Sequence, residues 1–329
     1  MNYSIIVPVY NRPDEVDELL QSLTIQTFKD FEVLIIEDGS KNRCKEVCDK
    51  YADRLALRYF YKDNSGPGQT RNYGAERAQG EWLIILDSDV VLPEGYMEAV
   101  EKGVEGTDVA AFGGPDASHP SFTPVQKAIS YSMTSFFTTG GIRGGKKKLD
   151  KFYPRSFNMG IRRDVYMQLG GFSKMRFGED IDFSYRIVEA GFQPQLFPEA
   201  WVWHKRRTDL RKFFRQVYNS GIARINLEKR HTSTMKLVHL LPTVFTIGVF
   251  ICVLVAIFWI WALLPLAFYS LVICADSTKQ NKSVHVGLLS VPAAFVQLMG
   301  YGLGFIESWW KRCVLGRDEF QAFEKNFYK

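Results

Sequence analysis

The chain has 329 residues, of which 23% are charged and 46% are hydrophobic, and its formal net charge is +5. This composition excludes a disordered chain and a protein made only of membrane helices, and the length allows about two domains. The five cysteines form no CxxC pair, which fits a reduced cytosolic compartment and argues against a zinc site.

Strand and helix patterns alternate along residues 1–204, the first of four segments into which we divide the chain. Continuous apolar runs at Tyr3–Val9, Phe31–Ile36 and Trp82–Leu86 are typical of buried parallel strands, and a further strand is expected at Leu55–Tyr61. Helical spacing separates these runs. The alternation predicts an α/β domain with a mostly parallel sheet and helices on both faces. Ligands bind such sheets beyond the carboxyl ends of the strands, so the polar residues that follow each run are the first candidates for a site.

Residues 205–236 are expected to form a basic amphipathic connector. Between residues 204 and 230, nine Lys or Arg stand against two acidic residues. Apolar side chains at helical spacing run beside them from Leu210 to Ile225. This combination favours a helix at an anionic membrane surface over a helix packed on the soluble domain, and it argues against nucleic acid as a partner.

Residues 237–308 are expected to be a membrane segment, and residues 309–329 a basic tail. The first 39 residues of the segment, 237–275, contain no Lys, Arg, Asp or Glu and are long enough for a hairpin of two crossings. Residues 284–306 form a third apolar stretch, which is either another crossing or a re-entrant or interfacial segment. The positive-inside rule places the connector and the first domain in the cytosol, at the inner face of the cell membrane.

Asp87-Ser88-Asp89 follows the apolar run at residues 82–86 and is the first candidate for chemistry. Two carboxylates separated by one residue at a bend can approach a single hard cation, and Mg²⁺ and Mn²⁺ bind such oxygen ligands together with phosphates. A cation held there would stabilise a diphosphate leaving group. Taken alone, the motif also fits a turn with solvated acids, or the aspartyl nucleophile of a haloacid dehalogenase-type phosphohydrolase at Asp87.

Further motifs accompany this one along the chain. They are Pro8-Val9-Tyr10-Asn11, Glu37-Asp38-Gly39-Ser40, the run from Gly66 to Gly74, Gly178-Glu179-Asp180 and Trp201-Val202-Trp203-His204. Together and in this order they resemble the family 2 glycosyltransferases, over residues 1–230. The resemblance implies the GT-A fold, which is Rossmann-like, and inverting transfer of a sugar from a nucleotide-diphosphate sugar to an acceptor hydroxyl.

The same resemblance implies roles for individual residues. The nucleotide-sugar donor would be bound by Pro8, Tyr10, Asp38, Arg71 and Asp87. The metal and the diphosphate would be held by Asp87, Asp89 and His204. Asp180 would be the catalytic base, and Asn158 and Glu179 would lie on the acceptor side. A base is needed in any case, because the acceptor hydroxyl must lose its proton as its oxygen attacks the anomeric carbon.

The expected cofactor is a divalent metal, Mn²⁺ or Mg²⁺, and the expected donor is a UDP-sugar, with GDP and dTDP left open. The expected acceptor is a glycan or lipid-linked glycan in glycan or polysaccharide biosynthesis, and membrane lipids are further partners. The QxxRW pattern of processive synthases is absent around Arg215–Asn219, so we expect non-processive transfer, with a processive polysaccharide synthase as the competing interpretation.

Three further classes of protein fit the sequence less well. A dinucleotide-binding oxidoreductase lacks support because Arg71 stands where the third glycine of the fingerprint would fall. The phosphohydrolase motif usually lies on the first strand, whereas three strands are expected before Asp87. A binding protein without catalysis would not need the acids of these motifs. Residues 122–150 are expected to be a loop, either a lid over the donor or acceptor or an inert connection.

Overall fold

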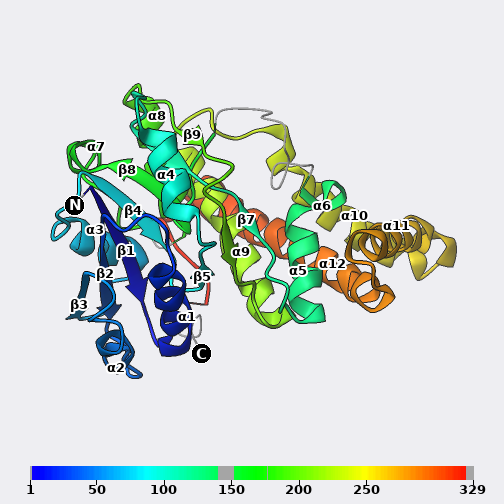
Figure 1. Ribbon diagram of the computed structural model, residues 1–329. Helices are drawn as coiled ribbons and strands as arrows, with labels where there is room; N and C mark the ends of the chain where they lie inside the picture. The colour runs from blue at the N-terminus through cyan, green and yellow to red at the C-terminus, as the bar shows by residue number, and fades with distance from the viewer. Residues whose placement is uncertain (1, 140–151, 176, 324–329) are drawn as a thin grey trace. The chain divides into compact units, whose positions relative to one another are not determined.

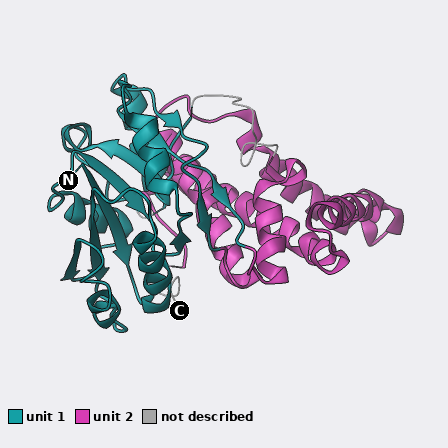
Figure 2. Cartoon of the chain, viewed as in Figure 1, with its two compact units in different colours: residues 1–119, 150–205 teal, residues 120–149, 206–329 magenta. Residues whose placement is uncertain are grey.

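The computed structural model describes residues 2–139, 152–175 and 177–323. The chain divides into two compact units (Figure 2). Residues 1–119 and 150–205 form the first unit, and residues 120–149 and 206–329 form the second.

The first unit is built on a seven-stranded sheet in the order β3-β2-β1-β4-β8-β6-β9 (Figure 1). In chain order these strands are β1 (Tyr3–Val9), β2 (Phe31–Asp38), β3 (Leu57–Lys62), β4 (Trp82–Leu86), β6 (Ala111–Gly113), β8 (Asn158–Arg162) and β9 (Gln195–Leu196). Strand β8 is antiparallel to its neighbours β4 and β6, and the other pairs are parallel. The sheet is therefore mostly parallel, as the alternation of elements predicts.

Helices cover both faces of this sheet. They are α1 (Pro13–Thr24), α2 (Lys45–Asp49), α3 (Pro67–Ala75), α4 (Tyr96–Val104), α7 (Arg163–Gln168) and α8 (Glu179–Glu189). Because consecutive strand residues point to opposite faces, Ile5 and Ile6 of β1 belong to different cores. The core that contains Ile5 includes apolar residues of α1, α2 and α4, and the core that contains Ile6 includes those of α3, α7 and α8.

A small second sheet in the order β5-β10-β7 completes the first unit. Its strands are β5 (Val90–Val91), β7 (Asp116–Ala117) and β10 (Val202–His204). Strand β10 is antiparallel to β5 and parallel to β7. This sheet brings the chain around residue 204 back beside the residues that follow β4.

The second unit is helical. It contains α5 (Pro124–Thr134), α6 (Phe136–Thr139), α9 (Leu210–Arg230), the short helices η1 (Leu237–His239) and η2 (Ile260–Leu263), α10 (Leu241–Ala256), α11 (Leu264–Asn281), α12 (Val284–Trp309) and the π-helical turn η3 (Trp310–Val314). Helix α12 packs against α5, α9, α10 and α11 (Figure 1). It is therefore the central element of this unit.

The apolar stripe of α9 differs from the sequence expectation of an interfacial membrane helix. Phe213, Val217, Ile222 and Ile225 are all buried. Glycines allow the two helix backbones to meet, because a Cβ at Gly304 of α12 would lie 2.0 Å from the carbonyl oxygen of Tyr218 on α9. The stripe thus packs on α12 instead of facing lipid.

The expected loop at residues 122–150 also differs, as far as the structure describes it. Residues 124–134 and 136–139 are helical, as α5 and α6. Helix α5 begins with a capping box, in which Thr123 accepts from the backbone N–H of Gln126 and the Gln126 side chain accepts in return, and Pro124 occupies the first turn. The part of the expected lid at residues 140–150 lies outside the described residues.

Three helical segments of the second unit are long and apolar enough to cross a membrane. They are Leu237–Ala256, Ile260–Asn281 and Val284–Val314. Within an apolar stretch of 18 residues in each segment, the buried share is 11% for each of the first two segments. It is 44% for the third segment, which contains α12. The third apolar stretch is one continuous helix despite Pro292, and these segments suggest membrane association.

Candidate active site

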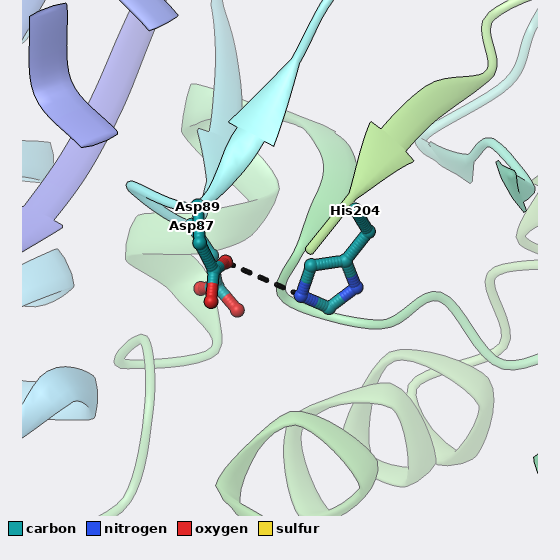
Figure 3. A group of neighbouring side chains, drawn as sticks. All are labelled: Asp87, Asp89 and His204. Atoms are coloured by element: carbon teal, nitrogen blue, oxygen red, sulfur yellow. Dashed lines mark ion pairs between the residues drawn. The ribbon is translucent and has the colours of Figure 1, made fainter. Parts of the chain in front are cut away.

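Asp87, Asp89 and His204 form one group in the first unit (Figure 3). Asp87 and Asp89 lie in the turn between β4 and β5, and His204 ends β10. Since β10 pairs with β5 so that His204 faces Val90, the register places the imidazole beside Asp89. One ligand atom from each of the three side chains lies within 4.8 Å of the others.

The orientation of His204 is fixed by its neighbours. Its ring stacks on Phe157 at a centroid distance of 4.8 Å, and its Nε2 lies 3.2 Å from Oδ1 of Asp89 (Figure 3). On the other side of the ring, Nδ1 lies 3.9 Å from Oδ2 of Asp116. That distance is longer than a hydrogen bond, so the ring is positioned by the stacking on Phe157 and by the contact with Asp89.

The donor set suits a divalent cation. Two carboxylates and one imidazole converge, and all three side chains are partly accessible to solvent, which leaves room for phosphate oxygens or water. Hard oxygen ligands are the preferred partners of Mg²⁺ and Mn²⁺, and imidazole is tolerated better by Mn²⁺. The residues present therefore fit such a metal ion.

Two arginines neutralise the carboxylates of this group. Arg12 donates through Nη1 to Oδ2 of Asp89 at 3.0 Å, and Arg71 donates through Nη2 to Oδ1 of Asp87 at 2.7 Å. Arg71 is buried and also donates to Oε1 of Glu179 at 3.0 Å. Arg71 therefore links the strand-end acids to the start of α8.

Asp180 lies at the start of α8, next to Glu179. Its Oδ2 accepts from Nε of Arg155 at 2.7 Å, and its Oδ1 accepts from the backbone N–H of Ile181 at 2.9 Å. Burial alone would raise the pKa of Asp180, but the charges of Arg155 and Arg71 and these hydrogen bonds outweigh burial, so the pKa is lowered. Asp180 is therefore ionised at neutral pH.

Glu179 has the opposite character. It is buried, and burial raises its pKa to about 7 against the opposing charge of Arg71, with the negative charge of Asp180 adding to the rise. The two adjacent acids thus differ in protonation near neutral pH, as pairs of carboxyl groups in one site commonly do.

Asp38 supports the loop that leads into α3. Its Oδ1 accepts from Nζ of Lys62 at 2.6 Å and from the backbone N–H of Ser65 at 2.8 Å, and its Oδ2 accepts from the N–H of Gly66 at 3.0 Å. A carboxylate has about four acceptor positions, so Oδ2 keeps one for a ligand.

The remaining nucleotide-pocket candidates lie at the same sheet edge. Pro8 is in β1 opposite Ile36 of β2, and Tyr10 directly follows β1. Asn11, with φ of 55°, accepts through Oδ1 from the backbone N–H groups of Lys41 and Asn42 and so joins the turn after β1 to the turn after β2. The turn after β1 is thus held next to the turn that begins at Asp38.

Asn158, which the sequence places on the acceptor side, has two hydrogen-bond partners within the first unit. It is fully buried in β8. Its Oδ1 accepts from the hydroxyl of Tyr96 at 2.7 Å, and its Nδ2 donates to the carbonyl oxygen of Ala200 at 2.8 Å. These contacts make Asn158 a structural residue that joins β8 to α4 and to the chain before β10.

Arg12 ends the polar stretch that follows the first apolar run, where a ligand is expected, and Arg155 lies outside the sequence motifs. Arg12 directly follows the Pro8–Asn11 motif, and that adjacency was an available signal. Arg155 belongs to no motif, and only the fold brings it to Asp180.

Comparison with known proteins agrees with this geometry. The family model "Glycosyl transferase family 2" matches residues 4–170. A glycosyltransferase of Haemophilus influenzae is 29% identical over 218 residues, which are 63% of this chain and 70% of that protein. A glycosyltransferase of Rickettsia felis is 35% identical over 141 residues, 42% of this chain but only 22% of that protein, so the match spans about a fifth of that relative.

Among solved structures, the fold is similar to that of the mannosyltransferase PcManGT from Pyrobaculum calidifontis, solved in complex with GDP-Man and Mn²⁺. The TM-score is 0.61 at 16% identity, over 94% of this chain and 88% of that one. A likeness at this identity supports the GT-A fold alone. The family model covers half of the chain and includes β1, β2 and β4 with the acids that follow them. The chain therefore belongs to glycosyl transferase family 2.

Proposed function

We propose that the protein transfers a sugar from a nucleotide-diphosphate sugar to an acceptor hydroxyl, with a divalent cation held by Asp87, Asp89 and His204. The observation that carries this proposal is the convergence of these three side chains at the end of β4. When bound, the cation would supply positive charge to the diphosphate as it leaves. A haloacid dehalogenase-type phosphohydrolase is not favoured, because the chain belongs to family 2.

The base in this proposal is Asp180. The acceptor oxygen attacks the anomeric carbon, the bond from that carbon to the diphosphate oxygen breaks, and its electron pair leaves with the nucleotide diphosphate. The acceptor proton passes to the Asp180 carboxylate, which the lowered pKa keeps ionised. Attack from the face opposite the leaving group inverts the anomeric centre.

Arg71 and Arg12 complete the site. Arg71 holds Asp87 and Glu179, so it fixes the strand-end acids relative to α8. Arg12 orients Asp89. Asp38, which orders the loop before α3, has one acceptor position left for a donor N–H of the nucleotide base.

Substitution of the base tests this assignment. Asp180→Asn keeps the shape of the side chain and removes its ability to take a proton. We expect kcat to fall by roughly 100- to 10,000-fold while the Kd of the donor stays nearly unchanged. Wild-type kcat in Asp180→Asn would show that another group is the base.

We expect a UDP-sugar as donor, and a thermal-shift screen identifies the nucleotide. The full chain in detergent is heated with UDP-, GDP- and dTDP-sugars, each with Mn²⁺, with Mg²⁺ or with a chelator. A donor that binds the folded protein raises the melting temperature in proportion to its binding free energy. A shift that needs both the metal and one nucleotide supports the proposal, whereas equal shifts with the chelator would contradict metal-assisted binding.

We further propose that transfer is non-processive and takes place at the cytosolic face of the membrane, on a glycan or lipid-linked glycan. The apolar helices of the second unit and the basic residues of 205–236 support this location. The full chain in lipid nanodiscs should show a higher kcat/KM with a lipid-linked acceptor than with the same glycan free in solution. Equal values for both would contradict a lipid-linked acceptor.

A further inference from the structure

Two adjacent phenylalanines of α6 are exposed on the second unit. The side chain of Phe136 is 72% exposed and that of Phe137 is 45% exposed, and their rings lie edge to face with centroids 6.0 Å apart. Each aromatic ring carries a large apolar surface, so a pair of exposed rings is costly in water and marks a surface that contacts something apolar.

The helix before this pair packs on two of the apolar helices. Ala128 of α5 is buried against Val286 and Ala293 of α12. One turn later, Tyr131 is buried with Ile273 of α11 and Ala294 of α12. Residues 124–139 are therefore attached to the helices that are apolar enough to cross a membrane, although they precede β8 in the chain (Figure 1).

Two hydrogen bonds fix the level of this segment along α11. The hydroxyl of Tyr131 donates to Oδ2 of Asp276 at 2.7 Å, and the hydroxyl of Tyr269 donates to the carbonyl oxygen of Phe137 at 3.2 Å. Asp276 and Tyr269 are two turns apart, which is about 10 Å along a helix axis. The segment thus runs from the polar end of α11 towards its apolar part.

At the level that α6 reaches, α11 itself exposes apolar side chains. Phe268 is 69% exposed and Leu271 is 68% exposed. Side chains of this kind on a helix suited to cross a membrane are solvated by lipid. Tyr269 holds α6 at this level of α11, within two residues of Phe268 and Leu271 along the helix.

We propose that residues 124–139 form a fourth membrane-contacting element, with Phe136 and Phe137 inserted among the acyl chains of a bilayer. The partner is a lipid surface, and the recognition is burial of apolar side chains. In α6 the N–H groups of Thr138 and Thr139 donate to the carbonyl oxygen of Ser135, and the carbonyl oxygen of Phe137 accepts from Tyr269. This element anchors the chain that precedes β8. The proposal does not depend on the identity of the sugar or on the catalytic mechanism.

Tryptophan substitutions test the depth of the pair. Phe136→Trp and Phe137→Trp are made in the full chain, which is reconstituted into vesicles of phosphatidylcholine brominated on the acyl chains. The added emission is the tryptophan fluorescence of a variant minus that of the wild type, which has seven native tryptophans. Phe268→Trp on α11 is the lipid-facing control, and Ile25→Trp, at a side chain 54% exposed in the first unit, is the matched exposed control.

We expect the brominated lipid to remove most of the added emission of Phe136→Trp and Phe137→Trp, as it does for Phe268→Trp, and to leave that of Ile25→Trp. Quenching of the pair by aqueous iodide, with no effect of brominated lipid, would overturn the proposal. A second experiment, lipid photolabelling of the wild type, does not depend on the folding of any variant. A photoactivatable phosphatidylcholine should label Phe136 or Phe137, and labelling of α11 without labelling of this pair would also overturn it.

Discussion

Asp89 is held from two sides by neighbouring side chains. Arg12 binds its Oδ2 and His204 lies against its Oδ1. The burial of Asp89 is therefore offset by positive charge and hydrogen bonding from the protein itself. A bound cation would contact oxygens that are already oriented, which reduces the cost of forming the site.

Removal of Asp89 tests the metal site directly. We expect Asp89→Ala to lower metal-dependent kcat/KM by roughly 100-fold or more, in line with the loss of one preorganised electrostatic contact. The variant should also lose the rise in melting temperature that Mn²⁺ gives the wild type. Asp49→Ala is the matched control, because Asp49 is an exposed acid that pairs with Lys45 on α2. A normal Mn²⁺ response in Asp89→Ala would place the metal elsewhere.

Glu179 predicts a pH dependence of stability. Its folded-state pKa is about 7, above its ordinary value of 4.5, so the folded protein binds this proton more tightly than the unfolded chain does. The contribution of this proton to the free energy of unfolding is fully present below about pH 4.5 and is lost as the pH rises towards 7. Asp180, with a lowered pKa, contributes stability above its ordinary value of 3.8 and changes little in this window.

Glu179→Gln removes this dependence. The difference in free energy of unfolding between wild type and Glu179→Gln should change between pH 5 and pH 7.5 by on the order of 1–3 kcal/mol. The variant should gain stability relative to the wild type at the higher pH. Thermal unfolding of both proteins at the two pH values measures this. Parallel pH profiles of the two proteins would show that Glu179 does not titrate in this range.

Much of the site follows from the order of strands and acids in the sequence. Asp38, Asp87 and Asp89 directly follow apolar runs, and the carboxyl ends of parallel strands meet at one edge, so their proximity is predictable. The ion-pair partners are not predictable in this way. Arg155 reaches Asp180 only through the fold, and the exclusion of Asn158 from solvent depends on Tyr96 and Ala200, which lie far away in sequence.

At the scale of the element, α9 shows why an amphipathic pattern alone does not choose a partner. A stripe of apolar residues is satisfied equally by lipid or by another helix. The deciding information lies in α12, where Gly300 and Gly304 face α9 and Gly302 faces α10, so that neighbouring helices can approach closely. The start of α5 is marked by a capping box between Thr123 and Gln126 and by Pro124 in the first turn.

Gly304→Ala tests the close packing of α9 on α12. The new methyl group would lie 2.0 Å from the carbonyl oxygen of Tyr218, so the helices must separate. We expect a loss of stability of about 1–3 kcal/mol, as for other overpacked positions. Gly248→Ala on α10 is the control, since a Cβ there meets nothing within 4 Å. Thermal unfolding in detergent should therefore show a lower melting temperature only for Gly304→Ala, and equal melting temperatures would argue against the contact.

At the scale of the whole molecule, the chain enters the helical unit twice. Residues 120–149 belong to it as well as residues 206–329. From the sequence alone the first segment is continuous up to residue 204, because the basic connector and the apolar segment both follow it. The earlier of the two segments, residues 120–149, is short. Its helix α5 is buried by α12, which lies about 160 residues further along the chain.

This double passage predicts how the protein responds to truncation. A chain cut after Arg230 keeps α5 and α9 but loses α12, so Ala128, Ile129 and Val217 lose neighbours such as Val286 and Val296. We expect this protein to aggregate and to bind a dye specific for exposed apolar surface. A second variant ends at Lys205 and replaces residues 120–149 by a flexible Gly/Ser linker. It removes the helical unit completely and keeps both cores of the sheet.

We expect the second variant to be monomeric, to unfold cooperatively and to retain the melting-temperature shift with Mn²⁺ and donor, because all residues of the candidate metal site lie in the retained unit. Size-exclusion chromatography and thermal unfolding compare the two truncations. A well-behaved protein cut after Arg230 would show that α12 is not needed to cover α5 and α9. The chain cut after Arg230 still contains α5 and α9 without α12, whereas the second variant lacks the whole helical unit. Comparing the two truncated proteins therefore distinguishes the effect of losing the membrane anchor from the effect of exposing a packed core.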